Sequence, residues 1–145
     1  MLKIALVALA LLAATPVFAQ SAAETDQKID DLLGPHEIYA TAVASIQKAV
    51  ADHDPSALSG YLSYGEPIKV NGEDVTLADE EDLTAQFDEL FNDKVVGAVT
   101  GQSYETLFVN SDGIMFGDGE LWLTGVCDDD ACENPFVNII AINNQ

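Results

Sequence analysis

The chain has 145 residues, of which 48% are hydrophobic and 21% are charged, a composition typical of one globular domain. Its 25 acidic residues against five lysines give a formal net charge of −20, and there is no arginine. A surface of that sign repels phosphate backbones and anionic lipid, so binding to nucleic acid or to a membrane surface is not expected.

The first nineteen residues have the pattern of a cleaved secretory signal. Residues 1–3 carry a positive charge, residues 4–13 are apolar, and residues 17–19 have the small residues that precede cleavage before Gln20. The apolar run is about half of the roughly 20 residues that a membrane helix needs, so no membrane insertion is expected after cleavage. We therefore predict a single domain, residues 20–145, that is periplasmic or secreted and has a net charge of −21 once the signal's lysine is removed.

Two helices are predicted at the start of the domain. Ser21 and Glu24 have the spacing of a capping box, which predicts a helix that is stopped by Gly34. A second helix is predicted over residues 36–52, because apolar residues recur there at three- and four-residue spacing. This apolar stripe comprises Tyr39, Ala42, Val43, Ile46, Ala49 and Val50. A short helical turn follows, with Asp54 as its N-cap.

The middle of the domain changes to extended chain. The alternation across residues 68–77 and the dipeptide Asn71-Gly72 predict a tight β-hairpin. Asp79 predicts the start of a third helix, whose apolar stripe is Leu83, Phe87, Leu90 and Phe91. Residues 94–101 are expected to form a connecting segment that is partly buried.

The sheet is predicted to follow. Residues 104–109 form a strand that turns at residues 110–113 into a long second strand, which residues 117–119 interrupt with a bulge or bend. In this long strand Leu121 and Leu123 share the face that best matches a helix-covered core, and Trp122 lies on the opposite face. The final run, residues 136–142, is apolar on both faces, as is typical of a central strand.

These elements predict an α+β domain in which a cone-shaped, curved mixed β-sheet holds the three helices in its concave face. The order of elements is similar to that of the nuclear transport factor 2-like superfamily. The segments that carry the resemblance are residues 108–110, 113–115, 117–122 and 139–143. The resemblance implies a pocket between helices and sheet, and frequent dimerisation through the sheet. It also implies that some members are isomerases or dehydratases with a buried carboxylate and tyrosine, while others only bind ligands or partners.

The two cysteines, Cys127 and Cys132, are expected to form a disulfide, because they are the only pair in a chain with a secretory signal. Closing so short a loop should stabilise the fold by only about 2 kcal/mol. Their spacing does not match a zinc site, and the aspartates between them lack the pattern of a calcium loop. We expect no metal site and no cofactor.

Catalytic candidates are few and weak: Tyr39 on the helical stripe, Asp118 at the bend, and Glu120 beside it. None of them matches an active-site motif of the enzymes in the superfamily. His36 and His53 lie at helix ends, where histidines commonly cap or face solvent. For a ligand pocket or an interface, the candidate residues are Tyr39, Met115 and Trp122.

Three functions stay open at this point. The first, and preferred, is non-catalytic binding of a small apolar ligand or a partner. The second is an isomerase- or dehydratase-type enzyme that uses a pocket carboxylate with Tyr39. The third is an acidic module, possible as a homodimer through the sheet face, that recognises a basic protein.

Overall fold

A computed structural model describes residues 20–145 and shows an α+β arrangement of five α-helices and a six-stranded mixed sheet. The predicted signal, residues 1–19, lies outside the described residues. Within residues 20–145, no helix has both the length and the apolar character that a membrane span requires.

The first three helices form as their sequences predict. They are α1 (Ala22–Leu32), α2 (His36–Ala51) and α3 (Pro55–Ser59). Ser21 and Glu24 make the complete capping box at the start of α1, and Asp54 caps α3. Each residue of the predicted apolar stripe on α2 is buried.

Two further helices follow the hairpin: α4 (Glu80–Leu90) and α5 (Asp93–Gly101). The N-cap of α4 is Asp79, as predicted, but α5 replaces the predicted connecting segment. The Asn92 side chain caps α5 by accepting hydrogen bonds from two backbone N–H groups, and burial of Val95 and Val99 holds the helix in place. Valine and glycine are weak helix formers, so tertiary packing overrides a weak local preference here.

The sheet has the strand order β2-β1-β6-β5-β4-β3. The strands are β1 (Pro67–Val70), β2 (Glu73–Thr76), β3 (Phe108–Asn110), β4 (Gly113–Phe116), β5 (Leu121–Val126) and β6 (Phe136–Ile142). β1 and β6 pair in parallel, and the other neighbours are antiparallel. β6 is central, as predicted, and the sheet is open because its edge strands β2 and β3 do not pair with each other.

Two predictions about the strands were wrong in detail. The first predicted strand begins only at Phe108, because Tyr104–Thr106 form a 3₁₀ turn. Residues 117–120 are a turn between the separate strands β4 and β5, in which Gly117 and Gly119 have positive φ values of 60° and 115°. The bulge lies elsewhere, where the pairing of β5 with β6 shifts between Trp122 and Leu123.

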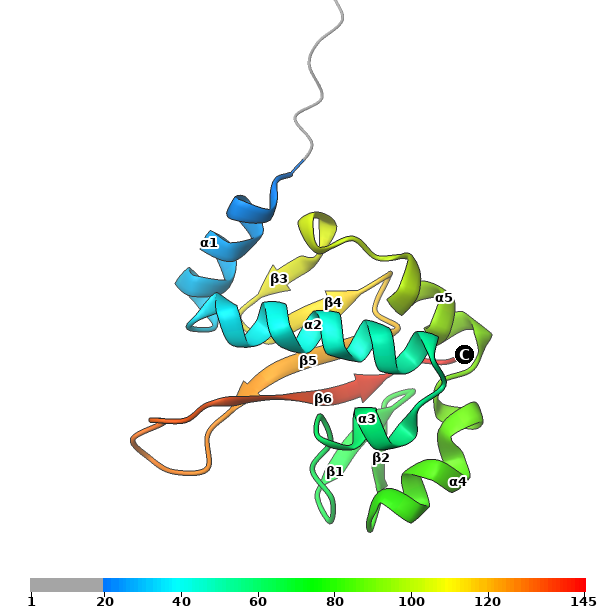
Figure 1. Cartoon of the computed structure of the whole chain (residues 1–145). Coiled ribbons are helices and arrows are strands. Elements are labelled where there is room, and N and C mark those ends of the chain that lie inside the picture. The colour runs from blue at the N-terminus through cyan, green and yellow to red at the C-terminus, as the bar shows by residue number, and fades with distance from the viewer. Residues whose placement is uncertain (1–19) are drawn as a thin grey trace, which may run out of the picture.

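The helices cover one face of the sheet, with α2 crossing that face (Figure 1). Contacts join α2 to β6, α5 to β5 and α1 to β3. The core between the layers is filled by large side chains that are at most 1% exposed, among them Tyr39, Phe91, Phe116, Leu121 and Leu123. The arrangement is consistent with the predicted curved sheet and its helical cover.

The β5–β6 connection projects away from the rest of the sheet (Figure 1). Cys127 and Cys132 form the predicted disulfide in it, with their Cα atoms 4.9 Å apart. The pair fits an oxidising compartment. Residues 127–134 are all exposed, so the disulfide closes a surface loop and is not part of the core.

Candidate functional site

Strands β4 and β5 alternate between the helix-covered face and an opposite, outer face. Met115 on β4 and Trp122 on β5 are only partly buried. The residues on either side of them in sequence, Ile114, Phe116, Leu121 and Leu123, are fully buried under the helices. Met115 and Trp122 therefore point to the outer face.

The strand register aligns one outer residue from each of the six strands. From edge to edge these residues are Asp74, Lys69, Ala141, Trp122, Met115 and Phe108. The first two form an ion pair, with 2.8 Å between Lys69 Nζ and Asp74 Oδ1. The other four are apolar, and together we call Phe108, Met115, Trp122 and Ala141 the outer row.

Side chains of the outer row contact one another across the strands. The rings of Phe108 and Trp122 meet edge to face, with centroids 6.3 Å apart and an interplanar angle of 78°. A Cβ atom at Gly119 would lie 3.5 Å from Trp122 Nε1 and 3.7 Å from Met115 Sδ, so the β4–β5 turn lies beside the two middle members of the row. Phe108 is 50% exposed, and the outer row is thus an apolar surface that no side chain shields completely.

The outer row lies in the part of the molecule that carries no charge. The 20 residues of β3, β4, β5 and β6 include no Asp, Glu, Lys, Arg or His. Each of the three connections between these strands is acidic, through Asp112, Asp118, Glu120, Asp128, Asp129, Asp130 and Glu133. An uncharged apolar surface is therefore bordered by acids at both ends of the strands.

The sequence predicted Met115 and Trp122 as members of a pocket or interface, and the structure brings these two together. It places Tyr39, the third predicted member, on the other side of the sheet. Sequence reasoning missed Phe108 and Ala141, because strand register is not visible in the chain. In so acidic a chain, the absence of charged residues within the four strands β3, β4, β5 and β6 is the sequence feature that could have indicated this face.

Tyr39 is a core residue on α2 that is 1% exposed. Its hydroxyl donates a hydrogen bond to the Leu33 carbonyl at 3.3 Å, and burial raises its pKa above the ordinary value. The ring ends against Gly125 of β5, where a Cβ atom would lie 2.3 Å from the hydroxyl oxygen. The hydroxyl is therefore engaged in packing and in a helix-end hydrogen bond.

Asp118 and Glu120 lie in the β4–β5 turn. The backbone N–H of Asp118 donates to Glu120 Oε2 at 2.7 Å, and Lys94 Nζ of α5 lies 3.5 Å from Glu120 Oε1. Burial alone would raise the pKa of Glu120, but these donors outweigh it and hold the pKa below the ordinary value. Glu120 is thus a stabilised carboxylate, and Asp118 is exposed.

The structure does not bring Tyr39 together with the predicted catalytic carboxylates, Asp118 and Glu120. Tyr39 reaches the sheet at Gly125, and Glu120, in the turn just before β5, is five residues earlier in the chain than Gly125. At about 3.3 Å per residue, this separation is roughly 16 Å, far beyond hydrogen-bonding reach. The general base and the hydroxyl donor of an isomerase-type mechanism would need to share one substrate.

A second cluster of titratable groups lies where α1 meets α2. His36 Nδ1 is 2.9 Å from Asp30 Oδ2, and the backbone N–H of His36 donates to Asp30 Oδ1 at 2.9 Å. These bonds lower the pKa of Asp30, and the hydrogen bond with Asp30 raises the pKa of His36. Nearby, the Tyr104 hydroxyl donates to Asp26 Oδ1 at 2.8 Å; burial, and then this bond, raise the pKa of Tyr104.

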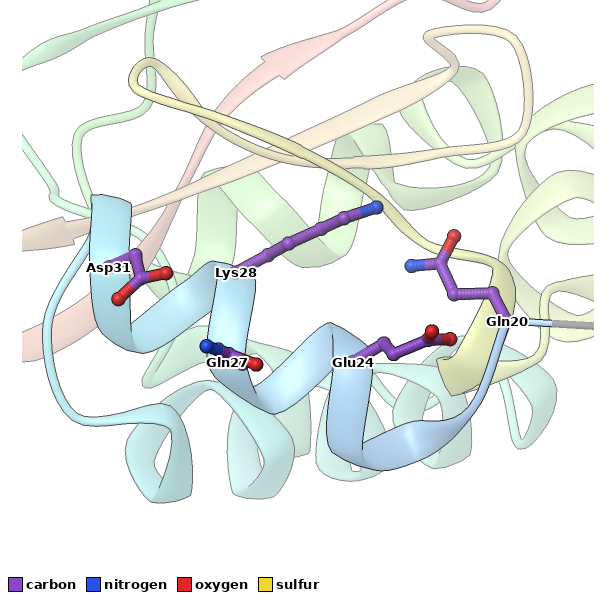
Figure 2. Close-up of a pocket in the computed structure, with 5 residues that line it drawn as sticks. All are labelled: Gln20, Glu24, Gln27, Lys28 and Asp31. Carbon is purple, nitrogen blue, oxygen red and sulfur yellow. The ribbon is translucent and has the colours of Figure 1, made fainter.

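Two surface hollows lie on the helices. One, of about 340 Å³, runs along α1 and is lined by Gln20, Glu24, Gln27, Lys28 and Asp31. Figure 2 shows the five polar side chains, four of them from α1 alone, with Lys28 extending along the groove. The other, of about 330 Å³, is lined by Ser45, Lys48, Ala49, Asp52, Asp54, Ala57 and Tyr61. Most residues that line either hollow are polar or charged, whereas sites for apolar ligands are lined mainly by hydrophobic and aromatic side chains.

In comparisons with known proteins, the chain matched no family model, no curated protein and no solved structure.

Proposed function

We propose that this protein is a non-catalytic binding module of the periplasm or the extracellular space, which docks a basic partner protein on the outer row. The observation that carries the proposal is the uncharged apolar row of Phe108, Met115, Trp122 and Ala141 between acidic connections. Folding requires apolar residues on the inner face of a sheet. It does not require the outer face of β3, β4, β5 and β6 to lack charge in so acidic a protein.

The size of the uncharged face favours a partner that also contacts its acidic border. Four strands about 4.8 Å apart, with about five residues of about 3.3 Å each, cover roughly 300 Å² in projection. A stable interface needs about 800 Å² from each partner. A tight complex must therefore extend beyond the strands and over the acidic connections.

Charge then selects between a second copy and a different protein. A second copy would bring its own acidic border, including Asp112 and Asp128, against acids of the first copy. A partner with apolar side chains between lysines or arginines would bury its apolar groups on the outer row and pair its cations with the border. Apolar burial and charge pairing both favour a basic partner. The electrostatic attraction to that partner should weaken as the salt concentration rises.

The geometry supports this function above the two alternatives. Tyr39 and its neighbours fill the interior between helices and sheet. Neither of the two hollows described suits a small apolar ligand. Tyr39 and Glu120 lie apart, which leaves the enzyme alternative without an assembled pair. Membership of the nuclear transport factor 2-like superfamily is part of the proposal, supported by helices on one face of a mixed sheet.

Two synthetic peptides of equal positive charge test the proposal, one alternating lysine with leucine and the other alternating lysine with serine. Fluorescence of Trp122, the only tryptophan, reports binding to the outer row. The leucine peptide should bind at least about tenfold more tightly, which corresponds to about 1.4 kcal/mol. Phe108→Ser should remove most of this preference.

Leu32→Ser is the matched control, because Leu32 of α1 is 48% exposed, close to the 50% of Phe108, and lies outside the outer row. It should leave the preference unchanged. Equal binding of the two peptides would show simple polyelectrolyte attraction and would overturn the proposal. So would a stable dimer in sedimentation velocity that Phe108→Ser dissociates, since it would assign the face to a second copy.

A further inference from the structure

Three potential metal ligands converge where α1 turns into α2. Asp30 is on the last turns of α1, and His36 and Glu37 are the first two residues of α2. Gly34, with φ of 106°, makes the reversal that brings the helix ends together. One donor atom from each of the three side chains lies within 4.8 Å of the other two.

The two distances from His36 lie on either side of the donor separation expected around a bound metal ion. His36 Nδ1 is 2.9 Å from Asp30 Oδ2 and 3.9 Å from Glu37 Oε2. Around an ion with bonds of about 2.0 to 2.1 Å, tetrahedral donors lie roughly 3.3 Å apart. Glu37 has a side chain that is 73% exposed, so a small rotation can complete the set without disturbing the core.

A further carboxylate lies behind the histidine, on the side away from these donors. His36 Nε2 is 3.9 Å from Asp26 Oδ2, and the Tyr104 hydroxyl holds the other oxygen of Asp26 through a bond of 2.8 Å. A metal-bound histidine commonly donates its other ring N–H to a carboxylate, which fixes the ring. This carboxylate comes from a different turn of α1 and is itself anchored by the 3₁₀ turn.

We propose that Asp30, His36 and Glu37 bind one divalent transition-metal ion of the Zn²⁺ type, with Nδ1 of the imidazole as the nitrogen ligand. A site with one imidazole and two carboxylates suits Zn²⁺ and its neighbours, whereas Ca²⁺ and Mg²⁺ prefer oxygen ligands alone. Water completes the coordination. The acidic surface of the chain raises the local concentration of cations around the site. The proposal is independent of the binding function of the outer row.

Isothermal titration of the EDTA-treated, desalted full domain with zinc chloride tests the site. We expect one Zn²⁺ per chain, and we expect His36→Ala to weaken its affinity by at least about tenfold. His53→Ala is the matched control, because His53 is the other histidine and has a carboxylate oxygen, Asp88 Oδ1, at 3.8 Å. It should leave the affinity unchanged.

Glu37→Gln separates metal binding from helix packing. His36 also joins α2 to α1 through Asp30, so its replacement can loosen the fold, whereas Glu37 is exposed. Glu37→Gln should lower the Zn²⁺ affinity without shifting the thermal midpoint of the metal-free protein. Absence of binding at one equivalent, equal loss in His53→Ala, or unchanged affinity in both His36→Ala and Glu37→Gln would each overturn the proposal.

Discussion

On β5, Leu123 is fully buried beneath the helices, whereas its neighbour Trp122 lies on the outer face against Phe108. Neither face of the sheet carries a charge along this strand, but for different reasons. The inner face contacts a helical layer that could not pack against charge. The outer face is exposed enough for Phe108 to be half accessible, so the packing of this chain does not explain its lack of charge. This difference between the two faces is the basis of the docking proposal.

The largest loss of stability is expected when a fully buried side chain of the inner face is shortened. Leu123→Ala should lower the free energy of unfolding by about 3 to 4 kcal/mol, through lost burial and a residual cavity. Urea denaturation followed by circular dichroism measures the change. A loss below about 1 kcal/mol would mean that the helices do not pack on this strand as described.

A smaller effect is expected where the inner face accommodates Tyr39. Gly125→Ala places a methyl group 2.3 Å from the Tyr39 hydroxyl oxygen and should cost about 2 kcal/mol. Tyr39→Phe removes that oxygen, so the same alanine should cost less in the Tyr39→Phe background. A double-mutant cycle measures the coupling, and strictly additive changes would refute the close contact.

The stability of the protein is expected to depend on pH through Glu120, which lies in the turn between β4 and β5. Its folded pKa is depressed below the ordinary value of 4.5, so its contribution is present above that value and is lost as pH falls through the folded pKa. Glu120→Gln should therefore destabilise the protein by about 1 kcal/mol at neutral pH. Thermal midpoints measured from pH 7 downward should converge for the two proteins in acid. If the thermal midpoints of the two proteins differed by the same amount at every pH, the charge of Glu120 would not contribute to stability.

The smallest effect on stability should come from the exposed end of the outer row. Phe108→Ser should lower the free energy of unfolding by no more than about 1 kcal/mol, because half of the side chain is already in water and its main contact is the edge of Trp122. Chemical denaturation beside Leu123→Ala gives the direct comparison of the two faces. If Phe108→Ser proved as damaging as Leu123→Ala, the outer row would be part of the core and the proposed docking surface would be lost.

Much of the local structure followed from short-range signals. Four features were predicted correctly: the buried stripe of α2, the Asp79 cap, the Asn71-Gly72 hairpin turn and strand β6. These features depend on residues within one or two turns of each other, or on the backbone preference of a dipeptide. The alternation around Leu123 was equally informative, because strand periodicity assigns residues to faces without knowledge of the fold.

What the sequence alone determined is therefore the type of most elements, the inward residues of its longer helices and strands, and the pairing of its two cysteines. Only the tertiary structure decided the α5 helix, the parallel pairing of β1 with β6, and the alignment of Phe108 with Met115 and Trp122. Each of these depends on contacts between residues far apart in the chain, whose energies outweigh weak local preferences. The same long-range contacts put Tyr39 and Trp122 on opposite faces of the sheet. The contacts of His36 with Asp26 and Asp30 are local and follow from the turn at Gly34.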